Sequence, residues 1–373
     1  MVAAKDLARA VVAAPWRGLA SIGIRRVANR PISFIVERQD WSIRWDGIQI
    51  CERINMRHPG VAGICARPER VTGAVAHFGS QFLWQVWHPY QSTSNKVVIS
   101  YFHGKPEDGP EMARHVDCFL KHLDRIDRVI VANRSVHERL LSWGVPAQQL
   151  ALIPIGVDTT RFRLPTDAER MEARRRFGVP DGMVAIGSFQ KDGVGWGDGM
   201  EPKLIKGPDL FVETVERLNR DFPVFVVLTG PARGYVKQGL DSRGIPYSHH
   251  YLENYFDVPH AYHALDLYLM TSREEGGPKS LLECAASGVP VVSSRVGMAP
   301  DVIDDGVTGC LTDVGDIDAT HAAAASLLSD VAKRVQLKAV ARDRVAAYDW
   351  SVVGDAHFSE VYEPLLRDMG LRA

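Results

Sequence analysis

The chain has 373 residues, enough for two domains, because single hydrophobic cores stop growing near about 250–300 residues. Hydrophobic residues make up 46% and charged residues 24% of it, as in an ordinary globular protein, and its apolar runs are far shorter than the about 20 residues that cross a bilayer. The formal net charge of −1 provides no global attraction for nucleic acid, so no nucleic-acid partner is expected.

The first thirty residues differ from the rest in charge. Residues 1–30 hold six basic residues and a single acid, Asp6, among small and apolar side chains. Basic residues lie on both sides of a short apolar stretch, which is not the pattern of a secretory signal. Two interpretations remain: a helix packed on the first domain, or a basic amphipathic helix on an anionic membrane surface.

The first half of the chain alternates strand-like and helix-like segments. A turn is expected at residues 45–47, and Ser135 is the expected N-cap of a helix over 135–143. Short apolar strands that alternate with helices indicate a parallel sheet covered on both faces. The expected strands are 31–37, 74–78, 96–102, 128–132 and 150–154.

A polar break at 158–169 precedes a second series of the same kind. Its expected strands are 184–188, 224–229, 267–271 and 290–293, and its expected helices include 207–219 and 278–287. Two consecutive units predict an α/β protein with two Rossmann-like doubly wound domains facing across a ligand cleft. The predicted divisions are a basic segment 1–30, domains 31–165 and 166–348, and a helical tail 349–373.

Cysteine and histidine usage favours a reduced, cytoplasmic protein that holds no metal. The five cysteines are scattered, odd in number and without C-x-x-C spacing. A group of histidines has no carboxylate or cysteine at a recognised ligand spacing, so we predict no metal site there. The members of this group are His249, His250, His260 and His263.

The most informative segment is a strand-to-helix turn at residues 272–283. Its two glycines let a ligand approach the backbone, and Pro278 is expected at the first helical position, followed by Lys279. A helix N-terminus offers unpaired N–H groups and a positive dipole end, which suits a diphosphate. Glu283, more than a turn inside the helix, is placed to accept hydrogen bonds from sugar hydroxyls beside it, whereas Glu275 lies on the loop.

The sequence EGGPKSLLE at 275–283, followed by CAASGVPVVSS, resembles the donor-site signature of the family 4 retaining glycosyltransferases, which have the GT-B fold. KGPDLFVETVERL at 206–218 and WSVVGDAHFSEVYEPLL at 350–366 resemble further parts of that family, so the likeness covers roughly residues 95–365. It implies a nucleotide-sugar substrate and no separate cofactor or catalytic metal.

The resemblance also implies roles for individual residues. Glu275 would contact the transferred sugar, Glu283 the ribose, and Lys206 the diphosphate, where its charge offsets that of the leaving group. The backbone of Gly276 and Gly277 would complete the phosphate cradle. His103, in Tyr-Phe-His-Gly at a strand end, matches a family histidine that points at donor or acceptor.

Three departures from the family pattern are visible. The family carries an arginine soon after the glycine that corresponds to Gly187. Here either Lys191 or Lys203 is expected to supply this second cation instead. An inserted loop at 192–202 holds four glycines and is a candidate lid. The glycine pair of the first N-domain loop is reduced to a single glycine, so acceptor contacts are predicted only weakly. They are Arg44, Trp45 and Gly47.

These observations favour a metal-independent hexosyltransferase that uses a UDP- or GDP-sugar, retains anomeric configuration and acts in polysaccharide or lipid-linked glycan synthesis. Its acceptor would be a sugar or glycolipid, and its place the cytoplasm, with the basic N-terminus as a candidate peripheral contact with the inner membrane face. Alternatives are a GT-B sugar-nucleotide epimerase or phosphorylase, and an inactive nucleotide-binding subunit. Intact Glu275, Glu283 and Lys206 disfavour the inactive subunit.

Overall fold

The structure, a computed structural model, describes residues 2–22, 30–37 and 42–372. It divides into two compact units. The first unit consists of Met1–Gly156 together with Trp350–Ala373, and the second unit is Val157–Asp349. The first boundary lies earlier than residue 165, where the sequence pattern put it. Val157 forms a parallel bridge with Asp349, and the Asp349 carboxylate accepts hydrogen bonds from the N–H (3.2 Å) and hydroxyl (2.6 Å) of Thr159. Residues 157–165 therefore belong to the second unit.

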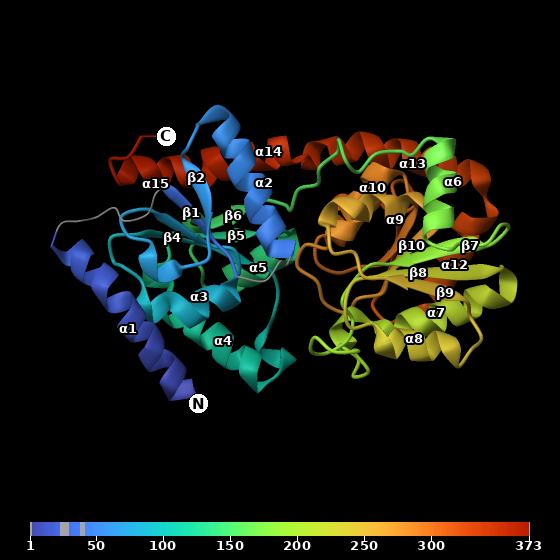
Figure 1. Ribbon diagram of the computed structural model, residues 1–373, viewed down its shortest axis with the longest axis horizontal. Coiled ribbons are helices and arrows are strands. Elements are labelled where there is room, and N and C mark those ends of the chain that lie inside the picture. The colour runs from blue at the N-terminus through green and yellow to red at the C-terminus, as the bar shows by residue number, and fades with distance from the viewer. Residues whose placement is uncertain (1, 23–29, 38–41, 373) are drawn as a thin grey trace. The chain divides into compact units, whose positions relative to one another are not determined.

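The first unit is built on a parallel sheet with the strand order β2-β1-β3-β4-β5-β6 over the described residues (Figure 1). The strands are short and apolar because both faces of the sheet are covered by helices. Their bounds are β1 Ile32–Ile35, β2 Ala62–Cys65, β3 Val75–Phe78, β4 Lys96–Tyr101, β5 Arg128–Val131 and β6 Leu150–Leu152. The helices are α1 Val2–Ser21, α2 Ser42–Arg57, α3 Gln81–Trp87, α4 Pro110–Lys121, α5 Arg134–Ser142, α14 Trp350–Ala356 and α15 Glu363–Asp368.

The turn expected at residues 45–47 is wrong, because α2 runs through them without a break. Gly47 faces the sheet, and a Cβ on it would lie 2.5 Å from Cδ1 of Phe34 and 2.9 Å from Cδ1 of Ile64. The glycine therefore serves close packing of helix on strand. Read without tertiary context, the same residue is a turn signal.

The N-cap of α5 also differs from expectation. Asn133, not Ser135, is the cap residue: its backbone is extended and its side-chain oxygen accepts the Val136 N–H at 2.8 Å. Asn133 comes two residues after β5, so the chain turns directly from strand into helix. Asparagine and serine are about equally favourable at the N-cap, so propensity could not separate the two positions.

The basic N-terminal segment forms α1 where it is described, and residues 23–29 lie outside the described residues. This helix packs on two short 3₁₀ helices, η1 (Pro68–Arg70) and η2 (His88–Tyr90). The Arg70 guanidinium lies 5.3 Å from the Trp16 ring centre, and Arg9 lies 5.9 Å from that of Trp87. The packing interpretation thus holds for α1, while membrane contact stays a prediction.

The second unit has its own parallel sheet, with the order β12-β11-β10-β7-β8-β9 over the described residues. Every residue of the long strand β8 is buried. The bounds are β7 Val184–Ser188, β8 Val224–Thr229, β9 Tyr247–His250, β10 Leu267–Met270, β11 Val291–Ser294 and β12 Cys310–Thr312. The helices are α6 Asp167–Arg176, α7 Pro208–Asp221, α8 Gly234–Asp241, α9 Val258–His263, α10 Lys279–Ser287, α11 Ala299–Val302, α12 Ile317–Ser329 and α13 Val331–Val345.

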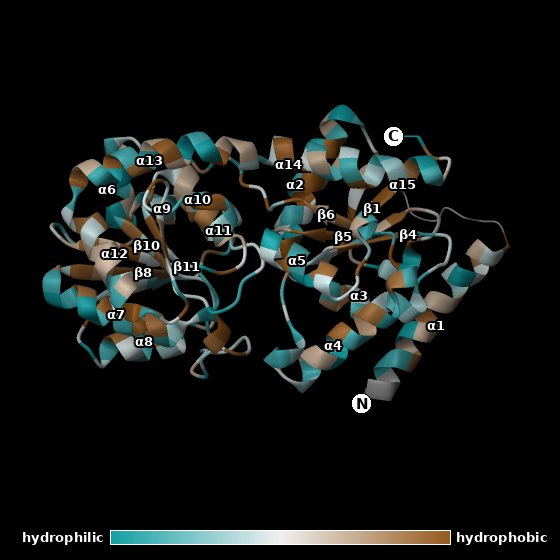
Figure 2. Cartoon of the chain, turned by 180° about the vertical axis from the view of Figure 1, so that it is seen from behind, coloured by the Kyte–Doolittle hydropathy of each residue, from teal (hydrophilic) through white to brown (hydrophobic). Residues whose placement is uncertain are grey.

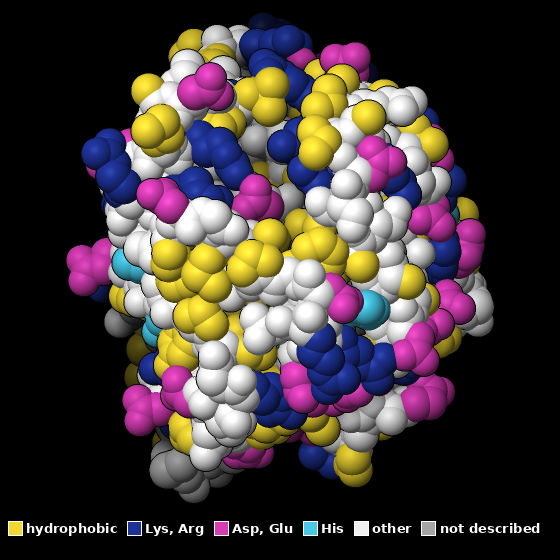
Figure 3. Space-filling model, turned by 90° about the vertical axis from the view of Figure 1, so that its right-hand side faces the viewer, with side chains coloured by type: hydrophobic (Ala, Val, Ile, Leu, Met, Phe, Trp, Pro, Cys, Tyr) yellow, Lys and Arg dark blue, Asp and Glu magenta, His cyan; other side chains and the backbone are white. Residues whose placement is uncertain are grey.

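Hydropathy follows these layers in each unit. The strands are brown and the outer faces of the helices largely teal in Figure 2, as expected for a sheet buried between amphipathic helices. On the face of the second unit that Figure 3 shows, acidic and basic side chains are interspersed. Over the described residues, none of the helices combines the length and apolar character that a bilayer crossing requires.

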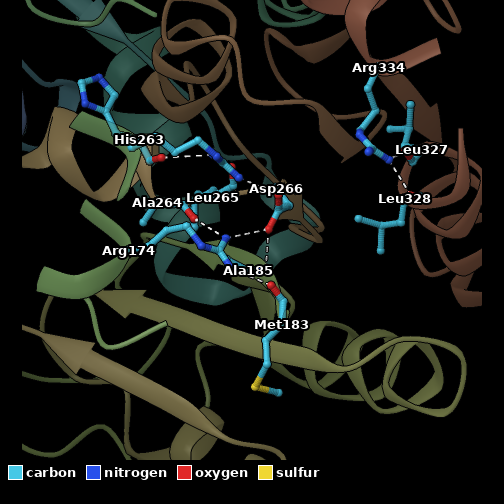
Figure 4. Close-up of polar contacts among 11 residues, drawn as sticks. Arg174, Met183, Ala185, His263, Ala264, Leu265, Asp266, Leu327, Leu328 and Arg334 are labelled. Carbon is cyan, nitrogen blue, oxygen red and sulfur yellow. Dashed lines mark hydrogen bonds and ion pairs between the residues drawn. The ribbon is translucent and has the colours of Figure 1, made fainter. Parts of the chain in front are cut away.

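The first helix of the second unit is tied to the sheet by charge. Asp266, just before β10, accepts hydrogen bonds from Arg174 (3.0 Å) and from the N–H of Ala185 (2.9 Å), while Arg174 also donates to the carbonyl of Met183 at 2.7 Å (Figure 4). Arg170 adds a bond of 2.7 Å to the other Asp266 oxygen. This network fixes α6 against the amino ends of β7 and β10, leaving their carboxyl ends for a ligand.

Candidate active site

In the second unit, a ligand is expected to bind at the carboxyl ends of β7 and β10. From β7 the chain proceeds outward to β8 and β9, and then returns to β10 on the other side of β7. Such a reversal of strand order opens a crevice at the strand ends, where doubly wound sheets bind ligands. The loops after these two strands hold the residues that the sequence motif singled out.

Glu275 lies at the centre of a polar network in this crevice. Its Oε1 accepts a hydrogen bond from Lys206 Nζ at 2.6 Å and another from the Ser272 hydroxyl at 2.8 Å. The Gln190 amide, just beyond β7, donates to the Lys206 carbonyl at 2.9 Å. Only 8% of the Glu275 surface is exposed, so this charge is buried beside its counter-ion. Sequence reasoning predicted Glu275 and Lys206 but not the supporting Ser272 and Gln190.

A tight backbone contact positions Lys206. Gly207, which follows it, has φ of 62° and precedes α7, and a Cβ there would lie 1.9 Å from the Thr271 carbonyl oxygen. The Thr271 hydroxyl donates to the Gly207 carbonyl at 2.8 Å. Arg273 forms a two-pronged ion pair with Asp209 at 2.7 and 2.6 Å, which lowers the pKa of Asp209. These contacts clamp the start of α7 to the loop that carries Glu275.

The Gly-Gly loop leads into α10 one residue later than expected. Pro278 is the N-cap, with ψ of 105°, so Lys279 is the first helical residue; the expectation of Pro278 at that position is wrong by one. No side chain of the described residues caps this helix start. Gly297, with φ of 52°, packs directly against the backbone of this loop. A Cβ on Gly297 would lie 2.5 Å from the Glu275 carbonyl oxygen and 2.8 Å from that of Gly276.

Glu283 is the fifth residue of α10, and two tyrosines hold it. Tyr255 donates to Oε1 at 2.6 Å and Tyr262 to Oε2 at 2.7 Å. Burial is the main cause that raises the pKa of Tyr262 well above its usual range, and the Glu283 charge raises it further. The phenol therefore keeps its proton and stays a hydrogen-bond donor. A carboxylate oxygen can accept more than one hydrogen bond, so a ligand hydroxyl can bind beside a phenol. No spacing in the sequence could have indicated either tyrosine, because they come from η7 (Tyr255–Asp257) and α9.

Two more lysines lie close to this site. The pKa of Lys203 is lowered, by burial first and then by the charge of Lys206, while Glu275 opposes the shift; Lys191 lowers it further. Lys191 also lies over the Trp196 ring, with Nζ 3.9 Å from its centre. Both predicted candidates for the second cation thus share the surroundings of Lys206, and the choice between them stays a prediction.

The inserted loop is anchored rather than loose. Asp192 and Arg233 form an ion pair with side chains 1% and 0% exposed, and Nε lies 3.0 Å from Oδ1 without the alignment of a hydrogen bond. Arg233 donates instead to the carbonyls of Ser188 and Thr229, at 2.6 and 2.8 Å. Burial raises the pKa of Asp192, and Arg233 opposes that rise.

The same loop covers the start of α8. The N–H groups of Gly234 and Tyr235 donate to the carbonyls of Asp198 (2.6 Å) and Gly199 (3.0 Å). The first turn of α8 is therefore occupied by the chain itself. Trp196, at the tip, is 59% exposed. A lid function stays a prediction.

The remaining predicted residues have other settings. Gly187 lies inside β7, where a Cβ would meet Leu265 Cδ1 at 2.3 Å, so packing alone explains this glycine. His103 follows β4 in the first unit, and its carbonyl accepts a bond of 2.7 Å from Gln81. The candidate acceptor residues Arg44, Trp45 and Gly47 lie on α2 of that unit.

Two of the four histidines between 249 and 263 contact backbone carbonyls. His249 Nε2 contacts the Gly230 carbonyl at 2.7 Å, and His263 Nε2 contacts that of Arg163 at 3.1 Å. Among the described residues, they do not form a group with metal-ligand spacing.

Comparison with known proteins relates this site to sugar transfer. Residues 201–344, which include Lys206, Glu275 and Glu283, match the model of the family Glycosyl transferases group 1. A GDP-mannose-dependent alpha-(1-6)-phosphatidylinositol monomannoside mannosyltransferase of Mycolicibacterium smegmatis is 30% identical over 245 residues, covering 60% of this chain and 58% of the relative. The lipopolysaccharide core mannosyltransferase LpsB of Rhizobium meliloti is 28% identical, covering 57% and 60%. The chain thus spans less than two thirds of these relatives.

Solved structures share the fold. Anabaena Alr3699/HepE in complex with UDP and glucose superposes with a TM-score of 0.70 at 16% identity, covering 87% of this chain and 97% of that one. Sucrose-phosphate synthase from Thermosynechococcus elongatus gives 0.74 at 17% identity, covering 91% and 100%. The two Rossmann-like units are those of the GT-B fold, and residues 201–344 of the second unit carry the match to the glycosyl transferases group 1 model.

Proposed function

We propose that the protein is a retaining glycosyltransferase that moves a hexose from a UDP- or GDP-sugar to a sugar or glycolipid acceptor, with no metal in the chemical step. The carrying observation is the pair of Lys206 and Glu275, 2.6 Å apart where β7 and β10 end. One group opposes negative charge on a departing phosphate, and the other favours positive charge on the sugar.

The donor would lie along the Gly-Gly loop and α10. Its diphosphate would meet the α10 N-terminus and Lys206, with Lys191 or Lys203 as the second cation, so that lysines supply the charge that other transferases take from a divalent ion. The ribose hydroxyls would bind Glu283, whose two oxygens are already oriented by tyrosines. The hexose would then extend toward Glu275.

The surroundings of Glu275 favour front-face displacement over a covalent intermediate. Its Oε1 accepts two hydrogen bonds, one of them from an ammonium group, and both reduce its power as a nucleophile. The acceptor hydroxyl would therefore attack from the side that the phosphate leaves, with its proton passing to the phosphate oxygen. That path retains the anomeric configuration.

The names of two relatives and the exposed side chains of α1 support one class of acceptor. Two relatives act, by their names, on a phosphatidylinositol mannoside and on a lipopolysaccharide core. Leu7 and Val11 on α1 are 67% and 63% exposed, next to basic residues, which suits contact with an anionic lipid surface. We propose a lipid-linked acceptor and a peripheral place on the inner face of the membrane.

A donor panel tests the proposal. The purified protein is incubated with UDP- and GDP-hexoses, with and without lipid-linked acceptors, and nucleotide release and the anomer of the product are measured. We expect one donor to be turned over with retention, and the rate to survive EDTA. An inverted product would refute the retaining mechanism. Loss of chemistry in EDTA that magnesium or manganese restores and zinc does not would refute the role of the lysines. Nucleotide binding without turnover of any donor would indicate an inactive subunit.

A further inference from the structure

A group of histidine and cysteine side chains in the first unit takes no part in the proposed transfer. Among the described residues it is the single group of three or more potential metal ligands whose ligand atoms lie within 4.8 Å of one another. It consists of His88, Cys118 and His122. We propose that these residues bind one zinc ion, which fastens η2 to α4.

The distances fit a tetrahedral zinc site. Cys118 Sγ lies 4.0 Å from His88 Nε2 and 4.0 Å from His122 Nδ1. Zn–S and Zn–N bonds of about 2.3 and 2.0 Å at a tetrahedral angle place sulfur and nitrogen about 3.6 Å apart. The two sulfur–nitrogen distances therefore need to shorten by only a few tenths of an ångström. Cys118 and His122 are four positions apart at the end of α4, the spacing that puts two side chains on one helix face.

The hydrogen bonding of His88 prepares it as a ligand. Its Nδ1 lies 2.9 Å from the Gln85 carbonyl, to which it donates, so the lone pair is on Nε2, the atom that faces Cys118. A metal-bound histidine commonly donates its other N–H to a backbone carbonyl in this way. His122 contacts the Cys118 carbonyl at 2.8 Å and would turn from it toward the metal.

The chemistry of the donor set selects the ion. One thiolate and two imidazoles suit zinc, and calcium or magnesium would require oxygen ligands. Three protein ligands leave the fourth coordination position of the zinc ion for water. The adjoining cavity of about 510 Å³ is lined by His88 and Asp124 among others. Zinc binds the thiolate form of cysteine, so binding displaces the Cys118 thiol proton and should tighten as pH rises. The positive charge of Arg125, which acts on His88, opposes the ion.

The site joins segments that are distant in sequence. His88 begins η2, on which α1 packs, while Cys118 and His122 end α4. Zinc would therefore stabilise the first unit and the seat of α1. It would take no part in the transfer reaction, so failure of this proposal would leave the proposed function intact.

Zinc titration of the full chain tests the site. The chelator-treated protein is titrated with zinc by calorimetry, and its thermal unfolding is followed with zinc at about 100 times the dissociation constant. We expect one equivalent to bind and the midpoint of the first unit to rise by about 5–10 °C. Cobalt in place of zinc should produce a thiolate-to-metal charge-transfer band.

Matched variants assign the ligands. Cys118→Ser and His88→Gln should lose the cobalt band and at least 90% of the affinity, whereas Cys65→Ser, a half-buried cysteine of the same unit, should keep both. His122→Gln provides a third test if Cys118→Ser does not fold. Substoichiometric zinc binding by the wild type, or equal affinity in folded His88→Gln and wild-type proteins, would overturn the proposal.

Discussion

Replacing Glu275 and Glu283 separately by glutamine should separate catalysis from donor binding. Glutamine matches glutamate in size, and its oxygen can keep the bonds of 2.6 and 2.8 Å from Lys206 and Ser272. Glu275→Gln therefore removes a charge and preserves the geometry. Loss of one transition-state electrostatic contact costs about 10²–10³ in kcat. Lys206, relieved of its counter-ion, remains available to the diphosphate, so the donor KM should stay nearly constant.

Glu283→Gln should act on binding instead. Both glutamate oxygens accept from tyrosines, and one of them becomes an NH₂ group in the variant, so a phenol as well as the ribose loses its acceptor. Losing one hydrogen bond to a charged group costs about 1.5–3 kcal/mol, or about 10- to 150-fold in affinity. The donor KM should rise by that factor with kcat largely kept.

Initial rates over a range of donor concentrations distinguish the two variants, and calorimetry with UDP and GDP measures affinity directly. A fall confined to transition-state stabilisation appears equally in kcat and kcat/KM. Glu274→Gln, one residue away on the same loop, is the matched control and should behave as wild type. If Glu275→Gln raised only KM while Glu283→Gln lowered only kcat, the donor would lie across this site in the opposite direction.

Three further predictions address stability and surface binding. Gly207→Ala should lower the unfolding midpoint of the second unit and abolish activity, because a Cβ at this position would lie 1.9 Å from the Thr271 carbonyl oxygen. Gly244→Ala is the control, since Gly244 also has a positive φ but has open space around it. Equal effects of the two substitutions would argue against the steric reason. Burial lowers the pKa of His357 to about 4, below the value near 6.5 in the unfolded chain. The free energy of unfolding of the first unit should therefore fall by up to about 3 kcal/mol as pH falls from 6.5 to 4. Urea unfolding of His357→Gln should show a smaller fall over the same pH range. Binding to anionic vesicles should fall steeply with salt and on removal of residues 1–30; equal binding without them would leave α1 as a packing helix only.

The sequence allowed the sheet and half of the site to be predicted, for identifiable reasons. Buried parallel strands such as β8 are continuous apolar runs, so their positions can be read locally. Glu275, Glu283 and Lys206 lie in motifs with a recognisable pattern. Tyr255, Tyr262 and Ser272 could not be predicted, because their roles exist only once distant segments meet at Glu283 and Glu275.

Errors occurred where one residue type serves two purposes. Gly47 was interpreted as a turn residue, but it serves close helix packing, which depends on Phe34 and Ile64 across the chain. The sequence rules rested on the absence of C-x-x-C spacing, whereas the ligands proposed beside Cys118 are a histidine four residues on and another thirty positions back. Spacing rules cover ligands on one element and miss those that the fold collects.

The anchoring of the inserted loop limits how it can be engineered. Shortening it would deprive the Gly234 and Tyr235 N–H groups of their acceptors and would strand the Arg233 guanidinium, wholly buried, without its carboxylate. Loops grafted from related proteins should therefore retain Asp192 and the turn at residues 198–199. The interchangeable portion is the short tip around Trp196, which can be varied while the frame that holds α8 is left untouched.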